Sequence, residues 1–121
     1  MAGNTEFGKR VRDLREARLK ADPSFTLRQF ATSVGISATF LSKVERGEFD
    51  PPAADKIKKM ADLLGVDADE LLALAGRVDP ELNDIIREKP TVLPDLLRTM
   101  RGMSDAELRA IVEQARKQQK P

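Results

Sequence analysis

Residues Thr26 to Gly47, TLRQFATSVGISATFLSKVERG, decide the fold class of this 121-residue chain. The first half of the stretch repeats apolar side chains at the spacing of a helix that is buried along one side. These side chains are Leu27, Phe30, Ala31 and Val34. Gly35 comes next, where a glycine in the left-handed conformation commonly ends a helix. The first half therefore predicts a short helix followed by a tight turn.

The second half of the stretch predicts another short helix. Ser37 is a favourable N-cap residue, and Thr26 with Gln29 forms the capping-box pattern of the preceding helix. The apolar side of the second helix would consist of Phe40, Leu41 and Val44. Its opposite side carries small, hydroxyl-bearing and cationic residues: Ala38, Thr39, Ser42, Lys43 and Arg46.

A helix with this outward side is suited to the major groove of double-stranded DNA, which is about 12 Å wide. Hydroxyl groups and cations can reach base edges and phosphates, and no acidic residue interrupts the helix before Glu45. An ordinary corner in a small helical domain is the alternative, because the apolar spacing alone is compatible with it. The outward side chains favour DNA binding.

The chain resembles the Cro/CI-type helix-turn-helix repressors, also called the XRE family, over roughly residues 5 to 76. The matching positions are Ala31, Gly35, Ser37, Leu41, Ser42, Val44 to Gly47, Pro51, Pro52, Ile57, Ala61, Leu64 to Val66 and Glu70 to Leu72. The resemblance implies an all-α fold with a five-helix, lambda-repressor-like DNA-binding domain. Leu27 departs from the family pattern, because many members have a DNA-contacting glutamine there.

The resemblance also implies an ion pair inside that domain. In the family pattern an arginine of the first helix pairs with the glutamate that ends the DNA-reading helix, and Arg15 and Glu45 occupy these positions. Such a pair would orient the reading helix while adding little net stability, since burial removes the hydration of both charges. Two surface charges that merely face each other are the alternative.

Composition argues against catalysis and metal binding. The chain contains no cysteine and no histidine, so the usual thiolate and imidazole ligands and the usual general base are missing. No glycine-rich nucleotide loop is present, so we expect no cofactor and no enzyme activity. The first residues lack the apolar centre of a signal peptide, and no apolar run approaches the roughly 20 residues of a membrane span. We therefore expect a cytoplasmic, nucleoid-associated protein without a membrane partner.

The two halves of the chain differ in charge. Residues 1–60 contain 12 basic and 8 acidic side chains, a net charge of +4, whereas residues 61–121 contain 9 and 12, a net charge of −3. The basic half carries the stretch that resembles a DNA-binding unit. This distribution is expected for a protein that contacts phosphates, and chance asymmetry on a solvated surface is the alternative explanation.

The rest of the expected DNA-binding domain, residues 5–76, predicts three further helices. They would span residues 6–18, 51–64 and 68–75. Asp50 would cap the second of them, which would begin with Pro51 and Pro52, and Asp67 would cap the third.

Residues 77–116 form a C-terminal segment with a different character. Lys89-Pro90 and Gly102 would divide it into three amphipathic helices, and Ser104 with Glu107 would form a capping box for the last one. A polar tail, 117–121, would follow. The segment presents large aliphatic side chains that suggest a dimer or partner surface: Leu93, Leu96, Leu97, Met100, Leu108, Ile111 and Val112. Packing of these helices on the first domain is the alternative.

These features together predict a sequence-specific transcriptional regulator, a homodimeric repressor of an inverted-repeat operator. The expected base-reading residues are Ala38, Thr39, Ser42 and Lys43. The expected phosphate contacts are Arg28, Arg46, Lys56 and Lys59. The alternative is an antitoxin-like or peptidase-controlled protein, which would autoregulate its operon through the same domain and bind a protein partner through its C-terminal segment.

Overall fold

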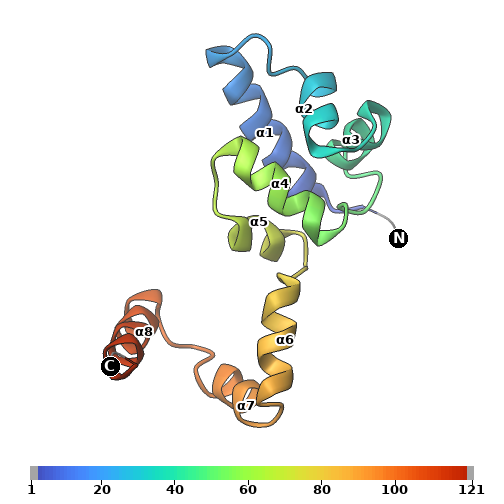
Figure 1. Ribbon diagram of the computed structural model, residues 1–121. Coiled ribbons are helices and arrows are strands. Elements are labelled where there is room, and N and C mark those ends of the chain that lie inside the picture. Colours follow the sequence, from blue (N-terminus) through green and yellow to red (C-terminus); the bar gives the residue numbers. More distant parts are fainter. Residues whose placement is uncertain (1–2, 120–121) are drawn as a thin grey trace. The chain divides into compact units, whose positions relative to one another are not determined.

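The computed structural model describes residues 3–119, and all regular structure in this range is α-helical (Figure 1). Its helices are α1 (Thr5–Ala21), α2 (Leu27–Val34), α3 (Ala38–Glu45), α4 (Ala54–Leu64), α5 (Ala68–Leu74), α6 (Pro80–Glu88), α7 (Val92–Thr99) and α8 (Asp105–Gln118). The all-α fold expected from the sequence is confirmed. Helices α1 to α5 correspond to the expected five-helix domain, and α6 to α8 correspond to the C-terminal segment.

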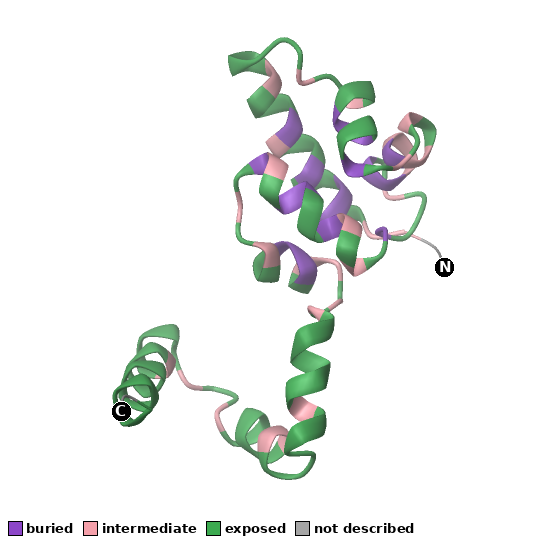
Figure 2. Ribbon diagram, in the orientation of Figure 1, coloured by how far each residue is buried: buried purple, intermediate pink, exposed green. Residues whose placement is uncertain are grey.

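The chain divides into two compact units, of which the first ends at Pro80 and the second begins at Glu81. The core of the first unit is formed by one side of each helix from α1 to α5 (Figure 2). Its buried apolar side chains are Phe7, Val11, Phe30, Ala31, Val34, Leu41, Val44, Ile57, Met60, Ala61, Leu64, Leu71 and Leu72. Helix α1 packs against α3, α4 and α5, and α2 packs against α3 and α4. Burial of these side chains is the main favourable contribution to the stability of the unit.

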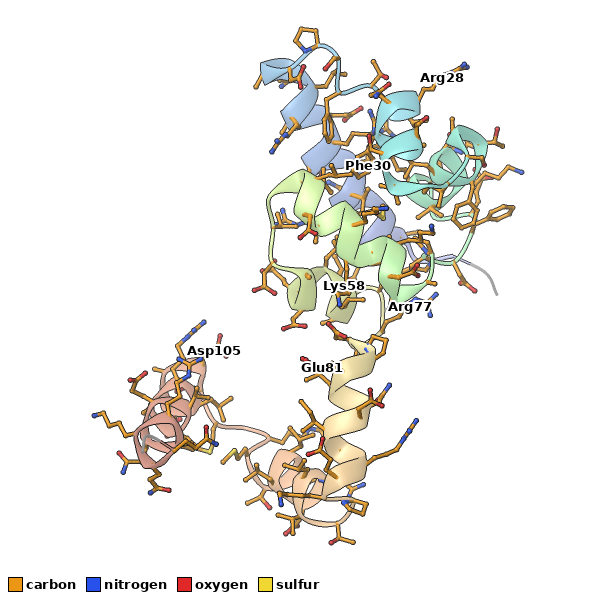
Figure 3. The ribbon with its side chains drawn as sticks, in the orientation of Figure 1. Arg28, Phe30, Lys58, Arg77, Glu81 and Asp105 are labelled. Carbon is orange, nitrogen blue, oxygen red and sulfur yellow. The ribbon has the colours of Figure 1, made fainter. Side chains whose placement is uncertain are left out.

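The residues that follow α5 contact other parts of the first unit. Arg77 donates from Nη2 to the carbonyl oxygen of Pro51 (2.6 Å) and from Nε to that of Pro52 (3.0 Å). Figure 3 shows Arg77 and Lys58 on this part of the molecule. The Nζ of Lys58 lies 2.9 Å from a carboxylate oxygen of Asp79. The chain after α5 is therefore tied to α4 and to the loop before it.

Polar contacts define both ends of α1. The Oδ1 of Asn4 accepts from the Phe7 amide (2.9 Å), and the Nδ2 of Asn4 donates to the Leu74 carbonyl (3.0 Å). The helix runs almost one turn beyond its expected end, because the turn is made at Asp22. The carboxylate of Asp22 accepts from the hydroxyl (2.7 Å) and the amide (3.0 Å) of Ser24, and these hydrogen bonds lower the pKa of Asp22.

The start of α4 differs from the prediction. Asp50 does not cap the helix, because its Oδ1 accepts from the Gly3 amide (2.8 Å). Pro51 and Pro52 are buried and precede the helix, and Ala53 occupies the N-cap without a side-chain hydrogen bond. The predicted cap was wrong because a proline disfavours the helical conformation in the residue before it, so the helix cannot begin at Pro51.

The second unit contains α6, α7 and α8, and these helices have no buried residue (Figure 2). The expected capping box of α8 is present: Ser104 Oγ accepts from the Glu107 amide (3.1 Å), and Glu107 Oε1 accepts from the Ser104 amide (2.9 Å). Helix α8 continues through Lys117 to Gln118, so it includes the first residues of the expected polar tail. Residues 120 and 121 of that tail lie outside the described range.

Candidate nucleic-acid interface

A tight turn at Gly35 joins α2 to α3. Gly35 has φ 90°, a left-handed conformation that residues with a side chain rarely adopt. Its amide donates to the carbonyl oxygens of Ala31 (2.9 Å) and Thr32 (3.1 Å), and the amide of Ile36 donates to Ala31 as well (3.0 Å). Backbone hydrogen bonds therefore fix the angle at which the chain leaves α2 and enters α3.

Hydroxyl side chains begin both helices. Thr26 Oγ1 accepts from the Gln29 amide (3.1 Å), and Ser37 Oγ accepts from the Phe40 amide (3.0 Å). Each cap satisfies an amide that has no partner within its own helix. The caps lie where the sequence placed them: Thr26 fixes the start of α2, and Ser37 allows α3 to begin directly after the turn.

The inner side of α3 is held against α1. Leu41 and Val44 of α3 are fully buried in the core. Gly8 of α1 approaches the end of α3 so closely that a Cβ atom there would overlap the Val44 carbonyl oxygen and lie 2.7 Å from that of Glu45. The two backbones are in direct contact at this crossing, and the absence of a side chain at Gly8 permits it.

Arg15 and Glu45 form a two-pronged ion pair between α1 and α3. Arg15 Nε lies 2.7 Å from Glu45 Oε2, and Arg15 Nη2 lies 2.9 Å from Glu45 Oε1. Only 8% and 4% of the two side chains are exposed. The hydrogen bonds to the carboxylate raise the pKa of Arg15 above its ordinary value. The structure thus brings together the two residues that the family resemblance paired.

The outward side of α3 presents the predicted base-reading residues to different extents. Thr39 is exposed, while Ser42 and Lys43 are half-buried. Ala38 is also half-buried because it packs against the core, so less of its methyl group faces solvent than the sequence suggested. The three polar side chains lie on one helix that the core, the turn and the ion pair hold in place.

The loop after α3 contacts these side chains, which the sequence reasoning did not anticipate. Lys43 Nζ lies 4.9 Å from the centre of the Phe49 ring, and Phe49 lies 5.9 Å from Phe40, centre to centre. Arg46 Nη1 donates to Ser42 Oγ (3.0 Å). The sequence does show an aromatic residue, Phe49, shortly after the helix. Its contact with Lys43 could not be predicted, because that contact depends on how the loop folds back on α3.

The predicted phosphate contacts come from three helices. Arg28 is exposed on α2, where Figure 3 shows its side chain pointing away from the domain. Arg46 is exposed at the end of α3. Lys56 and Lys59 belong to α4, where Lys59 is exposed and Lys56 is half-buried beside the turn at Gly35. The four cations therefore come from different parts of the helix-turn-helix region and the helix after it.

The predicted dimer or partner surface lies on α7 and α8. Four of its residues are exposed: Leu96, Leu97, Ile111 and Val112. The other three are half-buried: Leu93, Met100 and Leu108. The second unit also exposes Val92, Leu82 and Ile85. The aliphatic side chains of these helices are therefore only partly covered, and none of them is fully buried.

Two other kinds of site are missing from the described range. Residues 3–119 contain no group of three metal-ligating side chains placed to hold an ion. In the same range, no helix combines the length and the apolar character that crossing a membrane requires.

Comparison with known proteins places the first unit among DNA-binding regulators. A family model described as a helix-turn-helix domain matches residues 6–74. The chain is 39% identical over 72 residues to the uncharacterized HTH-type transcriptional regulator RghRB of Bacillus subtilis, covering 60% of this chain and 48% of the relative. It is 36% identical over 73 residues to the HTH-type transcriptional repressor RghR of the same organism, covering 60% and 50%.

A relative from another bacterium matches the same part of the chain. The uncharacterized HTH-type transcriptional regulator Rv0474 of Mycobacterium tuberculosis is 36% identical over 63 residues, covering 52% of this chain and 44% of the relative. The chain thus spans about half the length of these relatives. A solved SinR protein/SinI protein complex has a chain that is 22% identical, with 93% of this chain and 99% of that chain covered and a TM-score of 0.47. That structural likeness is too distant to carry an argument.

Proposed function

The chain belongs to the helix-turn-helix domain family, and from that premise we propose that it is a transcriptional regulator that binds double-stranded DNA with α3 in the major groove. One observation carries the proposal: Thr39, Ser42 and Lys43 occupy the outward side of a helix whose inner side is immobilised. A rigid helix with hydroxyl and ammonium groups on its free side can read base edges without reordering.

The chemistry of the side chains suggests how bases are read. Lys43 can donate to O6 and N7 of guanine, and Thr39 and Ser42 can donate or accept. The exposed part of the Ala38 methyl group can contact a thymine methyl. A hydroxyl group can form hydrogen bonds with several kinds of base, so Lys43 is the main candidate for distinguishing one base from another.

Contacts to phosphates would set the position of α3 along the groove. Arg28, Arg46, Lys56 and Lys59 are the proposed phosphate ligands: Arg28 lies on α2, Arg46 directly follows α3, and Lys56 and Lys59 lie on α4. Such contacts supply affinity that does not depend on sequence and that weakens as salt concentration rises.

We also propose that the regulator acts as a dimeric repressor. One short reading helix contacts few base pairs, and a two-fold dimer doubles the site into an inverted repeat. The exposed aliphatic side chains of α7 and α8 offer a surface for that dimer, and the name of RghR supports repression over activation. Occlusion of RNA polymerase from the operator would be the output.

Footprinting on the DNA upstream of the chain's own coding sequence tests the proposal. We expect protection of an inverted repeat, reduced operator preference for Lys43→Ala, and weaker binding of operator and random DNA alike for Arg46→Ala. A wild-type chain that protects no site and binds random duplex no better than a protein without a basic surface would contradict the function.

A second candidate function is regulation through a protein partner, in the manner of an antitoxin or of a repressor that a peptidase cleaves. The exposed surface of α7 and α8 favours it, because a partner could cover the same side chains as a second copy. Static light scattering separates the two: a dimer of the chain alone supports the repressor, and a monomer that becomes a defined complex only with the product of a neighbouring gene supports the second candidate.

A further inference from the structure

An acidic residue, Glu48, lies in the loop directly after α3 and pairs with Arg46. Glu48 Oε2 accepts from Arg46 Nε at 2.6 Å, and about half of each side chain is exposed. The backbone of the loop is fixed in place, because the amides of Glu48 (2.8 Å) and Phe49 (3.3 Å) both donate to the Lys43 carbonyl oxygen. The fold therefore holds this carboxylate beside Arg46.

We propose that Glu48 is an internal substitute for a DNA phosphate, which occupies Arg46 in the free protein and restrains binding to non-specific DNA. The inference rests on the proposed function, since it assumes that Arg46 contacts phosphate. An aspartate or glutamate carboxylate and a phosphate oxygen make the same charge-assisted hydrogen bond to a guanidinium group. A phosphate can therefore take the place of the carboxylate on Arg46.

The restraint arises from competition for Arg46. While Arg46 and Glu48 are paired, they contribute almost no net charge to the DNA-binding side. When a phosphate displaces Glu48, Arg46 loses one charge-assisted hydrogen bond as it gains another, so the net gain from that phosphate contact is reduced. An exposed pair is weak enough to open readily, so Glu48 reduces affinity without blocking binding.

The pair also connects phosphate binding to base reading. In the free protein, Arg46 donates to Glu48 and to the hydroxyl of Ser42, a proposed base reader. A phosphate that captures Arg46 would release the Ser42 hydroxyl toward a base edge. Glu48 thus penalises all DNA, whereas only a matching operator gains the contact to Ser42 in return.

The test is Glu48→Gln, which removes the charge and keeps the shape of the side chain. We expect random duplex to bind about three- to tenfold more tightly near physiological salt, with a salt dependence that is steeper by roughly one phosphate contact. Operator DNA should gain a similar factor, because the competition from Glu48 applies to every DNA that places a phosphate on Arg46. Glu70→Gln is the matched control. Glu70 lies on α5, which packs on α4 and α1, and its Oε1 is 3.8 Å from Nη2 of Arg10.

A double variant separates pairing from general repulsion. If Glu48 acts through Arg46, the gain from Glu48→Gln should largely disappear in an Arg46→Ala background. An equal gain in both backgrounds, or an equal gain from Glu70→Gln, overturns the inference. A wild-type chain that binds no DNA removes the proposed function itself, whereas a wild-type chain that binds DNA and is unaffected by Glu48→Gln removes only this inference.

Discussion

The guanidinium group of Arg15 meets the carboxylate of Glu45 at 2.7 and 2.9 Å across the crossing of α1 and α3, almost out of contact with solvent. Every side-chain polar atom buried in the described range has a hydrogen-bond partner, so the charges sit in a satisfied environment. The pair joins α1, which packs in the core, to α3, the proposed DNA-reading helix. We infer that its main role is to orient α3, since desolvation offsets much of the attraction.

Loss of one partner of this pair should destabilise the first unit strongly. We expect Glu45→Ala to lower the free energy of unfolding by about 3 to 5 kcal/mol, because it leaves the Arg15 charge buried and unpaired. Urea denaturation measures the change. Asp13→Ala is the control, since its pair with Lys9 is exposed and should contribute less than about 1 kcal/mol.

The second partner provides a check on this explanation. Replacing both residues by apolar ones, Arg15→Met with Glu45→Leu, should recover most of the lost stability, because no unpaired charge remains. A double variant as unstable as Glu45→Ala would mean that the carboxylate supports α3 by some means other than pairing.

Gly8→Ala should destabilise the domain, although alanine normally stabilises a helix relative to glycine by about 0.5 to 1 kcal/mol. The added Cβ would overlap the Val44 carbonyl and force α1 and α3 apart, which we expect to cost about 1 to 3 kcal/mol. Thermal unfolding measures the effect. Gly76→Ala is the comparison, because Gly76 has φ 72° and open space around it, so only backbone strain acts there. A Gly8→Ala variant that is more stable than wild type would show that the crossing is not tight.

The sequence predicted the helices whose signals are local. The apolar spacing of Phe30, Ala31 and Val34 and the caps at Thr26 and Ser37 were sufficient for α2 and α3, because these signals lie within the helices themselves. The pairing of Arg15 with Glu45 spans 30 residues, and it came from the family resemblance and not from any local pattern.

The features that the sequence missed depend on tertiary contacts. Asp50 is a good cap residue by type, but its carboxylate is used by the Gly3 amide. The contacts of Phe49 with Lys43 and of Glu48 with Arg46 follow from a loop that turns back on α3. Nothing in the order of these residues indicates that turn. The sequence therefore suggests a helix with free basic side chains, whereas in the structure the charge of Arg46 is partly compensated by Glu48.

Phe49 should position Lys43 for base reading. The ammonium group lies 4.9 Å from the ring centre, a geometry worth about 0.5 to 1 kcal/mol at an exposed site. We expect Phe49→Leu to reduce the ratio of operator to random-DNA affinity about two- to fivefold while leaving random-DNA affinity unchanged, and Phe49→Tyr to retain it. Competition binding assays measure the ratio. Full selectivity in Phe49→Leu would assign the ring to packing against Phe40 alone.

Glu107 should titrate below its ordinary range. The hydrogen bond from the Ser104 amide is the main cause that lowers the pKa of Glu107, and the Ser104 hydroxyl adds to it. Because the pKa is lower in the folded state, the capping box stabilises α8 above the unfolded-state pKa, and this contribution is lost as the pH falls through the folded-state pKa. NMR titration should show a higher pKa of Glu107 in Ser104→Ala. Glu107→Gln should remove the pH dependence of this cap, so an unchanged acid response of α8 in that variant would contradict the assignment.

The end of the DNA-binding unit should lie after Pro80. Truncation there keeps the hydrogen bonds from Arg77 to the Pro51 and Pro52 carbonyls and the pair between Asp79 and Lys58. We expect this truncated chain to unfold cooperatively, with a core like that of the full chain. Truncation after Gly76 deletes Arg77 and leaves two carbonyl groups without their donor, which should cost about 1 to 3 kcal/mol.

The same truncation tests the dimer. If α6 to α8 supply a two-fold interface, the chain that ends at Pro80 should be monomeric, bind random DNA nearly as well as the full chain, and lose much of its operator affinity. The full chain should be a dimer by light scattering at micromolar concentration, and its protected half-sites should be about 34 Å apart, one turn of DNA. The deleted helices bury no residue of their own, and exposed aliphatic surface of this kind often marks an association surface. A full-length chain that stays monomeric at that concentration, both free and on operator DNA, would exclude the dimer and leave α7 and α8 available to a different protein.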